Sequence, residues 1–328
     1  MQLSREVLVE CVHNWGSNSV VEALLDPACM IFSLPNILGF IGFYENRRCA
    51  VVFGDPVCAP FDREKLTEAF HAFCESRKKN VVYLVASQGF AYWMHERQQS
   101  ALIPFGEELF LDPQNDPREA SGKRGISLRG KLRHAEKEGL LVNEYQGRTP
   151  ELEHKIQEVA KQWIHHRTGP QVYVSRVHLF TERFGKRWFY VLQGDKILAG
   201  LVLNQIQGTK GWALDRIMTI PKSPQGTSEF LVISVLEKIA QEGCGFLTFG
   251  AINNANLGKV TGFGSFTSWM IHHFYKLSLK FFNLEEKRRF WEKFQPQSTP
   301  VFLIFKKPRL GFHELKGLMH ALNVSIKD

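Results

Sequence analysis

Positively charged side chains that suit phosphate binding are concentrated between residues 121 and 139 of the 328-residue chain. If this segment is helical, Arg129, Arg133 and Lys137 follow at i, i+4 and i+8 and line one face. Such a face is either solvated and laced with i,i+4 ion pairs, or it binds the phosphates of a nucleic acid. The helix would dock on the rest of the protein through an apolar stripe of Leu128, Leu132 and Ala135.

Histidine and cysteine residues show no spacing that is typical of a metal site. The six cysteines are scattered without a CxxC pair, and most lie in apolar surroundings, where a free cysteine behaves as a small hydrophobe. The twelve histidines include doublets at 165–166 and 272–273, but adjacent side chains point in different directions and no HExxH motif accompanies them. The sequence therefore predicts no metal and suits a reducing compartment.

The size and charge of the chain limit its class and its partners. A length of 328 residues with 44% hydrophobic content predicts two domains with separate cores. The formal net charge of +8 favours phosphate-bearing partners, either RNA or anionic lipid. Apolar runs such as 36–44 fall far short of the ~20 residues that a spanning helix needs, and the N-terminus shows no secretory pattern. We expect a cytoplasmic protein that contacts the inner face of the membrane peripherally.

The elements that must position the charged residues begin with a hairpin. Apolar runs at 37–44 and 49–53 are joined by a polar turn and predict two antiparallel strands. Apolar residues at helical spacing over 61–74 predict a helix, and the β-branched run 81–85 predicts a strand after it. Further strands are predicted at 29–34 and 107–111.

The second half repeats this order. Strands are predicted at 188–193 and 197–205, joined by a Gly194-Asp195 turn. A strand at 212–220 and an amphipathic helix over 230–239 follow. A helix at 151–165 precedes the hairpin, and a strand at 246–249 follows the second helix. The recurrence of hairpin, helix and strand predicts two copies of one α/β unit.

Several segments, in order, resemble the C-terminal catalytic domain of the phosphatidylglycerol lysyltransferases, also called multiple peptide resistance factors. The resemblance spans most of the chain, and the ordered set is much more specific than any single motif. It rests first on Gly54-Asp55-Pro56 and Phe105-Gly106-Glu107-Glu108, then on the basic helix from Leu128 to Gly139 and on Trp163, which follows that helix. In the second half it rests on Asp215 to Leu231, which resembles D-x-x-R…P-x-G-x-x-D-F-L, and on Arg288 to Pro296, which resembles R…KFxP.

The resemblance implies an α/β (α+β) protein with two tandem GNAT-like domains, each a mixed central sheet flanked by helices. This agrees with the two copies read from the order of elements. The expected boundaries are 1–120 for the N-terminal domain, 121–148 for the basic linking helix and 149–328 for the C-terminal catalytic domain. The 328 residues contain no counterpart of the membrane-embedded flippase part of the large bacterial enzymes.

The implied activity is transfer of an aminoacyl group from aminoacyl-tRNA to a lipid hydroxyl, such as that of phosphatidylglycerol, without a cofactor. Asp215 would bind the α-ammonium group of the amino acid or help to remove the acceptor's proton. Arg216 and Lys293 would supply positive charge to a phosphate or to the oxyanion. Substrate contacts are expected at Gly226, Glu229, Asn253 and Arg288, and contacts to the tRNA backbone at Arg129, Lys131, Arg133 and Lys137.

Two positions depart from the family pattern. Met218 stands where the family's D-x-x-R segment has its arginine, and Arg216 follows Asp215 directly. Positions 216 and 218 share a face of a strand, so that Arg216 would serve from the same side. Glu229 replaces the family's aspartate and keeps the charge.

The turn before the amphipathic helix at 230–239 is poorly suited to bind the pyrophosphate of coenzyme A. A pyrophosphate is usually held by backbone N–H groups of a loop written R/Q-x-x-G-x-G/A at a helix N-terminus. Here Gly226 is a single glycine, Pro224 lacks an N–H group, and the Glu229 carboxylate would repel a phosphate. These residues disfavour an acyl-CoA donor.

Other interpretations remain open. The chain is either the aminoacyltransferase described above, a GNAT-type acyltransferase using acyl-CoA or another acyl donor, or a non-catalytic tRNA- or lipid-binding module, which the methionine at 218 would favour. Asp215 and Arg216 either form an ordinary ion pair or meet Lys293 in one cleft of the second half. The aromatic residues at 281, 282, 290 and 291 either line a lipid path or belong to the core, and the tail 306–322 is either an interfacial helix or packs on its own domain.

Overall fold

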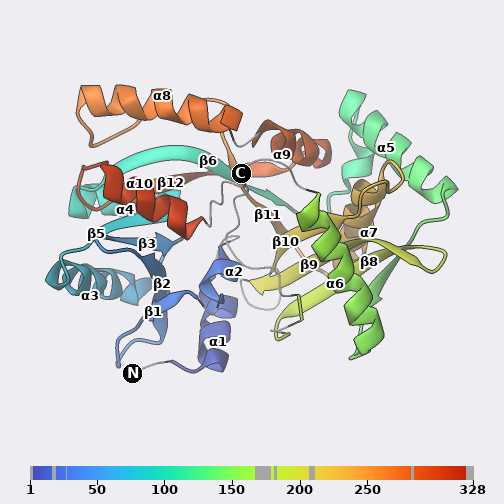
Figure 1. Ribbon diagram of the computed structural model, residues 1–328, viewed down its shortest axis with the longest axis horizontal. Helices are drawn as coiled ribbons and strands as arrows, with labels where there is room; N and C mark the ends of the chain where they lie inside the picture. The colour runs from blue at the N-terminus through green and yellow to red at the C-terminus, as the bar shows by residue number, and fades with distance from the viewer. Residues whose placement is uncertain are drawn as a thin grey trace.

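The part of the chain that the structure describes folds around one mixed sheet of twelve strands with helices on both faces (Figure 1). The computed structural model describes residues 3–16, 20–26, 28–166, 179–180, 183–206, 211–281 and 284–322. In that part of the chain the strand order is β1-β2-β3-β5-β12-β6-β11-β10-β9-β8-β7, with β4 paired to β2. The α/β class predicted from the sequence is confirmed.

The first half opens with short helices and the predicted hairpin. Asn46 closes the hairpin because its side-chain oxygen accepts hydrogen bonds from the backbone N–H groups of Arg48 and Cys49, both at 2.8 Å. The elements are α1 (Arg5–Trp15), α2 (Val21–Leu24), β1 (Met30–Phe32), β2 (Gly39–Glu45), β3 (Cys49–Phe53), β4 (Val57–Cys58), η1 (Pro60–Asp62), α3 (Arg63–Ser76), β5 (Asn80–Ser87), α4 (Gln88–Gln98) and β6 (Ala101–Leu111).

The second half contains the basic helix and the predicted second hairpin. Gly194 takes a φ of 56° at the hairpin turn, a conformation that glycine adopts without steric cost. The elements are η2 (Pro117–Glu119), α5 (Gly122–Lys137), β7 (Leu141–Tyr145), α6 (Pro150–His165), β8 (Lys186–Gln193), β9 (Lys196–Ile206), β10 (Gly211–Thr219), α7 (Thr227–Gln241), β11 (Phe246–Asn253), α8 (Ser265–Phe281), α9 (Leu284–Trp291), η3 (Glu292–Phe294), β12 (Gln297–Phe305) and α10 (Phe312–Ala321).

The same unit occurs twice. In the first half, β2 and β3 form the antiparallel hairpin, α3 crosses over, and β5 pairs parallel to β3. In the second half, the predicted hairpin of β8 and β9 is followed by β10, which pairs antiparallel to β9. Helix α7 then crosses over, and β11 pairs parallel to β10. The repeated order of hairpin, helix and strand is confirmed, and the two halves form a tandem GNAT-like fold.

The two units exchange a strand, which fuses their sheets. The strand that follows β5 along the chain, β6, pairs with β11 of the second unit, while the strand that follows β11, β12, pairs with β5 of the first. The exchanged strands also pair with each other in the middle of the sheet. The predicted domain boundaries at 1–120 and 149–328 stay a prediction. Strand β12, although it lies near the end of the chain, is placed between β5 and β6 of the first half.

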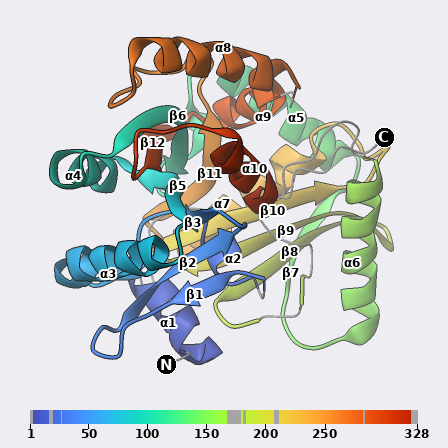
Figure 2. The same cartoon turned by 60° about the vertical axis from the view of Figure 1, so that its left-hand side comes forward.

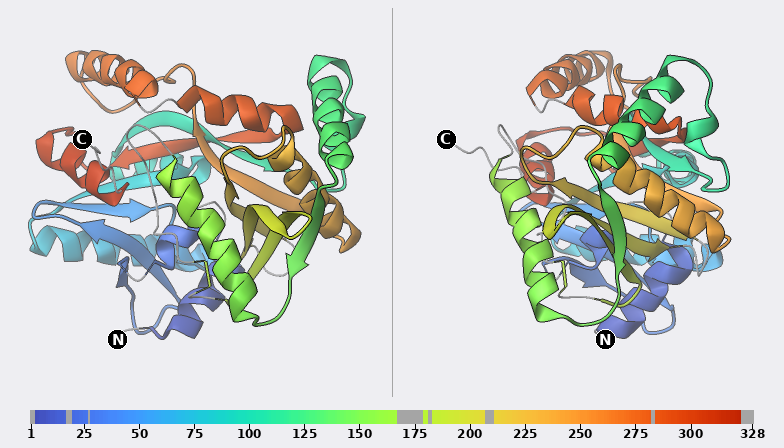
Figure 3. Two further views of the ribbon diagram at one scale, coloured as in Figure 1. Left: turned by 45° about the vertical axis from the view of Figure 1, so that its right-hand side comes forward. Right: turned by 90° about the vertical axis from the view of Figure 1, so that its right-hand side faces the viewer.

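Helices cover the second half from both sides (Figure 3). One face of β9 and β10 packs against α6, and the other face packs against α7. Helix α5 docks beside α7 through Leu128, Leu132 and Ala135, whose exposed fractions are 0%, 6% and 0%. The apolar stripe predicted from the sequence is therefore confirmed.

The C-terminal helix α10 packs on strands of the first half. Asn46 donates a 3.1 Å hydrogen bond to the carbonyl of His313, and the Asn80 amide donates to the buried Glu314 carboxylate. Gly317 lies so close to Cys49 that an added Cβ would come within 3.2 Å of its sulfur. The tail thus packs on the protein, although on the first half and not on the half to which it belongs in sequence.

Candidate functional site

A buried carboxylate at the start of α7 is held by two lysines from distant parts of the chain. Glu229 lies in the first turn of α7 and is 4% exposed. Lys131 of α5 and Lys293 of η3 place their ammonium nitrogens 2.6 and 2.7 Å from the same oxygen, Oε1. The three side chains form the Glu229 cluster, which joins the basic helix, the start of α7 and the family-like segment near the C-terminus.

Burial and hydrogen bonding set the protonation of the Glu229 cluster. Burial alone would raise the pKa of Glu229, but the hydrogen bonds from both lysines outweigh it and hold this pKa below 4.5. Burial lowers the pKa of Lys293, and the neighbouring Lys131 ammonium acts in the same direction. Burial also opposes charge on Lys131, but its hydrogen bond to Glu229 prevails and raises its pKa.

The glycine before α7 permits close packing of α5. Gly226 has a φ of 94°, which favours glycine, and a Cβ on this residue would lie 2.4 Å from the backbone oxygen of Lys131. The backbone of α5 therefore occupies the space beside the turn. Of the residues predicted to bind substrate, catalyse or hold tRNA, the structure brings Gly226, Glu229, Lys293 and Lys131 together here.

Asp215 and Arg216 form a second ion pair where two strands part. The parallel pairing of β10 and β11 ends at Ala213 and Thr248, although both strands continue. Asp215 is the extra residue of a β-bulge, since Leu214 and Arg216 oppose consecutive residues of β9. A bulge re-aims side chains, and here Arg216 Nε lies 3.0 Å from Asp215 Oδ2. With exposed side-chain fractions of 7% and 10%, the pair is largely buried.

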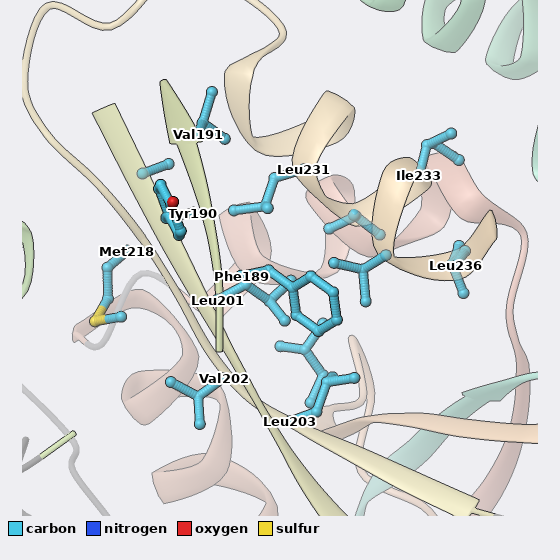
Figure 4. Close-up of a cluster of buried hydrophobic side chains, with 14 of the residues drawn as sticks. Phe189, Tyr190, Val191, Leu201, Val202, Leu203, Met218, Leu231, Ile233 and Leu236 are labelled. Atoms are coloured by element: carbon cyan, nitrogen blue, oxygen red, sulfur yellow. The ribbon is translucent and has the colours of Figure 1, made fainter. Parts of the chain in front are cut away.

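The methionine that replaces the family arginine lies in the core. Arg216 and Met218 oppose Val202 and Gly200 of β9, so they share a face of the sheet as predicted. Figure 4 shows Met218 and Val202 on the other side of the strands from Leu231 and Leu236 of α7. Met218 is 0% exposed, so its thioether fills apolar space and offers no charge.

The Asp215–Arg216 pair and the Glu229 cluster are connected through β10. The hydroxyl groups of Thr219, at the end of β10, and Ser228, one residue before Glu229, lie 2.8 Å apart. This contact fixes the end of the strand to the first turn of α7. The meeting of Asp215 and Lys293 in one cleft stays a prediction, because the contacts given above pair each of them with another residue.

Arg288 and Asn253, both predicted to bind substrate, meet at the end of β11. The Arg288 guanidinium donates a 2.7 Å hydrogen bond to the backbone carbonyl of Asn253 and lies 3.7 Å from a Glu107 carboxylate oxygen. Arg288 is thus held by Asn253 and Glu107, while 25% of its side chain stays exposed.

Aromatic packing fixes the segment that carries Arg288 and Lys293. Trp291 is 5% exposed and stacks on Phe249 of β11 with ring centroids 4.3 Å apart. Phe290 packs edge-on against Trp291. These two residues belong to the core, the second of the two interpretations given above. The side chain of residue 281 and the whole of residue 282 lie outside the described part of the chain.

The basic helix presents only part of its charge to the outside. Arg133 and Lys137 are exposed, as predicted for a face that meets a partner. Arg129 instead donates hydrogen bonds to the backbone carbonyls of Arg118 and Ala120, at 2.5 and 3.0 Å. One of the three residues at i, i+4 and i+8 therefore holds the preceding loop in place.

Sequence reasoning assigned no role to Glu108, which the structure places beside the parting strands. This carboxylate is 5% exposed and accepts a hydrogen bond from the hydroxyl of Thr248, the last residue of the parallel pairing. The signals in the sequence are the family-like segment from Phe105 to Glu108 and two adjacent carboxylates in a strand, one of which must face inward. The described residues include no group of three or more histidine, cysteine, aspartate or glutamate side chains that could hold a metal ion.

Comparisons with known proteins agree with the fold. Residues 23–305 match the family described as phosphatidylglycerol lysyltransferase, C-terminal. The C-terminal domain of a putative lysylphosphatidylglycerol synthetase from Agrobacterium fabrum is 17% identical, with a TM-score of 0.79, and the match covers 98% of this chain and 96% of that one. The L-PGS structure from Bacillus licheniformis is 17% identical, with a TM-score of 0.74, over 97% and 95% of the two chains. No curated protein sequence matches.

A third solved structure, a protein of unknown function from Bacteroides thetaiotaomicron, is 8% identical, with a TM-score of 0.63, over 93% of this chain and 98% of that one. At these identities the likeness shows the fold alone. The fold is a tandem GNAT-like architecture, and the family match makes the protein an acyltransferase. Because the family match spans most of the chain, the protein belongs to the phosphatidylglycerol lysyltransferase C-terminal domain family.

Proposed function

We propose that this protein transfers an aminoacyl group from aminoacyl-tRNA to the hydroxyl group of a lipid such as phosphatidylglycerol. The observation that carries the proposal is the Glu229 cluster, which sets two ammonium groups around one buried carboxylate at the start of α7. Family membership supports lipid aminoacylation as the type of reaction.

The geometry at the start of α7 argues against coenzyme A as the acyl donor. A pyrophosphate there would need free backbone N–H groups and open space. The backbone of Lys131 fills the space next to Gly226, and the Glu229 carboxylate lies in the first turn of the helix. Both features favour a donor whose acyl group arrives without a pyrophosphate at this position, as an aminoacyl ester does.

The protein does not need to activate the acyl donor, because the amino acid of aminoacyl-tRNA is already an activated ester. The lipid hydroxyl oxygen attacks the ester carbonyl carbon, the bond to the terminal ribose oxygen breaks, and that oxygen takes up a proton. Asp215 binds the α-ammonium group or helps to remove the hydroxyl proton. Arg216 and Lys293 provide positive charge for the oxyanion or a nearby phosphate.

The two substrates approach through different charged residues. The exposed Arg133 and Lys137 of α5 bind the tRNA backbone, where phosphate contacts position the RNA without reading its sequence. Lys131 lies on the same helix, and its ammonium group contacts Glu229, so the positive surface of α5 reaches the Glu229 cluster. Arg288, held at Asn253, meets the phosphate of the lipid headgroup.

The test is a transfer assay with each radiolabelled aminoacyl-tRNA and a total lipid extract, followed by thin-layer separation. Label that moves to a lipid with one aminoacyl-tRNA supports the proposal and names the amino acid. Saturable binding of coenzyme A, with transfer from acyl-CoA alone, would support the other acyltransferase. Binding of tRNA and lipid without transfer would leave a non-catalytic module.

The reaction places the protein at a membrane surface on the cytoplasmic side, where both substrates are available. No helix in the described part of the chain is long and apolar enough to cross a bilayer. We propose that contact with the membrane is peripheral.

A further inference from the structure

Helix α8 turns large apolar side chains toward the solvent. On α8, Phe266, Trp269, Phe274 and Leu277 are 72%, 63%, 59% and 52% exposed. A helix on the surface of a globular protein normally presents polar residues outward and buries its apolar stripe. The helix lies along the outer edge of the molecule in every view (Figure 2). These four residues, which we call the α8 face, form an apolar surface without a partner among the described residues.

The opposite side of α8 is fixed to the protein, so the α8 face is held outward. Ile271 is 5% exposed and belongs to the core of the first half. The Tyr275 hydroxyl lies 2.5 Å from the Phe105 carbonyl oxygen and 2.7 Å from that of Asn254. A roll of the helix that buried the apolar residues would break both contacts.

The rings on the α8 face are stacked in sequence. Phe266 and Trp269 have ring centroids 6.2 Å apart, and Trp269 stacks on His273 at 5.7 Å. Mutual stacking restricts the rotamers of these side chains before any partner arrives. Less conformational entropy is then lost when the rings become buried.

The positive charge of α8 favours an anionic partner. The helix contains two lysines and two histidines and no aspartate or glutamate, and the exposed Lys259 lies just before it. Large apolar rings beside basic residues, without acidic ones, suit the interface of an anionic bilayer. A second copy of the chain would bring like charges together across the contact, with no acid on the helix to pair them.

We propose that the α8 face docks on an anionic lipid bilayer and inserts Phe266 and Trp269 among the headgroups. Tyr275, on the inner side of α8, contacts the carbonyl of Asn254, and the carbonyl of the preceding Asn253 accepts the hydrogen bond from Arg288. A bilayer seated on α8 is thereby linked through Tyr275 to the end of β11, where Arg288 of α9 is anchored. This docking goes beyond the transfer reaction and does not depend on it.

The test is co-sedimentation of the whole chain with vesicles of phosphatidylcholine alone or mixed with phosphatidylglycerol. The wild-type protein is expected to bind the mixed vesicles more tightly. A Phe266→Ser/Trp269→Ser variant should lose about tenfold or more in affinity, since each ring removed from water contributes strongly. Because both residues are exposed, its melting temperature should stay near that of the wild type. A Phe61→Ser variant, which alters an 85% exposed ring on the distant η1, should bind as the wild type does.

Insertion of the ring itself is tested by fluorescence quenching with brominated lipids, comparing wild type with Trp269→Phe. The quenched signal should fall in the variant even though the protein still folds and binds. Equal binding by wild type and the double variant, or no quenching assigned to Trp269, would overturn the proposal. A concentration-dependent dimer that the double variant abolishes would identify a second copy of the chain as the occupant. A fall in transfer activity from detergent-solubilised lipid as large as the fall in vesicle binding would point to the reaction site instead.

Discussion

The ammonium group of Lys293 lies 2.7 Å from the carboxylate of Glu229, across 64 residues of sequence. The same carboxylate oxygen also binds Lys131, 98 residues before it. Because Glu229 is buried, neither contact is the loose surface pair that contributes little to stability. One carboxylate therefore both positions the lysine that we assign to catalysis and fastens the basic helix to α7.

Removal of the Glu229 charge should cost both activity and stability. A Glu229→Gln variant leaves two ammonium groups side by side, and we expect transfer to be lost and the free energy of unfolding to fall by about 1–3 kcal/mol. Urea unfolding and the transfer assay measure the two effects. The matched control is Glu292→Gln, next to Lys293, whose pair with Arg124 is exposed and should contribute less than about 1 kcal/mol. Equal behaviour of the two variants would contradict the role of the cluster.

The stability of the protein should depend on Glu229 at acid pH. Its pKa in the folded protein is held below the ordinary 4.5, so its contribution is complete above that value and is lost as the pH falls through the folded pKa. Wild type and Glu229→Gln should therefore converge in free energy of unfolding as the solution becomes acidic. Denaturant titrations at a series of pH values test this. Curves that stay parallel into the acid range would show that Glu229 is not the titrating group.

Asp215 should be needed for transfer beyond its part in folding. Asp215→Asn is expected to reduce the rate at least about 100-fold, as loss of a proton-transfer or ammonium-binding group does. Because the pair with Arg216 is largely buried, some loss of stability, about 1–3 kcal/mol, is also expected. Met218→Leu, a change of similar volume in the same strand, should keep activity and lose less than about 1.5 kcal/mol. A rate that falls only in proportion to the folded fraction would assign Asp215 a structural role.

Arg133 and Lys137 should bind RNA, whereas Arg129 should serve the fold. Changing Arg133 and Lys137 together to alanine should weaken tRNA binding. It should also flatten the slope of log affinity against log salt concentration by the equivalent of up to about two phosphate contacts. The control, Lys65→Ala with Lys196→Ala, removes the same charge from exposed positions on other elements. Arg129→Ala should instead lower the free energy of unfolding by about 1–3 kcal/mol, since it leaves two carbonyls without their donor. An RNA affinity that responds alike to both double variants would remove α5 from the site.

Local patterns predicted the parts of the fold that depend on neighbouring residues. The turn at Asn46, the apolar stripe of α5 and the hairpin at Gly194 follow from the period of hydrophobic residues and from turn chemistry. The helix α4 was not predicted, because its buried residues Phe90, Ala91 and Met94 form only a narrow stripe.

The arrangement of the site was less accessible to sequence reasoning. The exchange of β6 and β12 is a choice between long-range pairings that hydrophobic period does not distinguish. Glu229 and Lys131 were singled out in separate roles, but their contact depends on the packing of α5 against Gly226. The pairing of Arg129 with backbone carbonyls depends on the path of the loop before the helix, which helical spacing cannot give.

The most direct measurement of the central claim uses purified phosphatidylglycerol and a single aminoacyl-tRNA labelled in the amino acid, with wild type and Asp215→Asn run side by side. The account predicts a labelled lipid with the wild type, no labelled lipid when the RNA is digested beforehand, and a loss of product with the variant greater than its loss of folded protein. Transfer that survives digestion of the RNA, or that proceeds equally well in the variant, would contradict it.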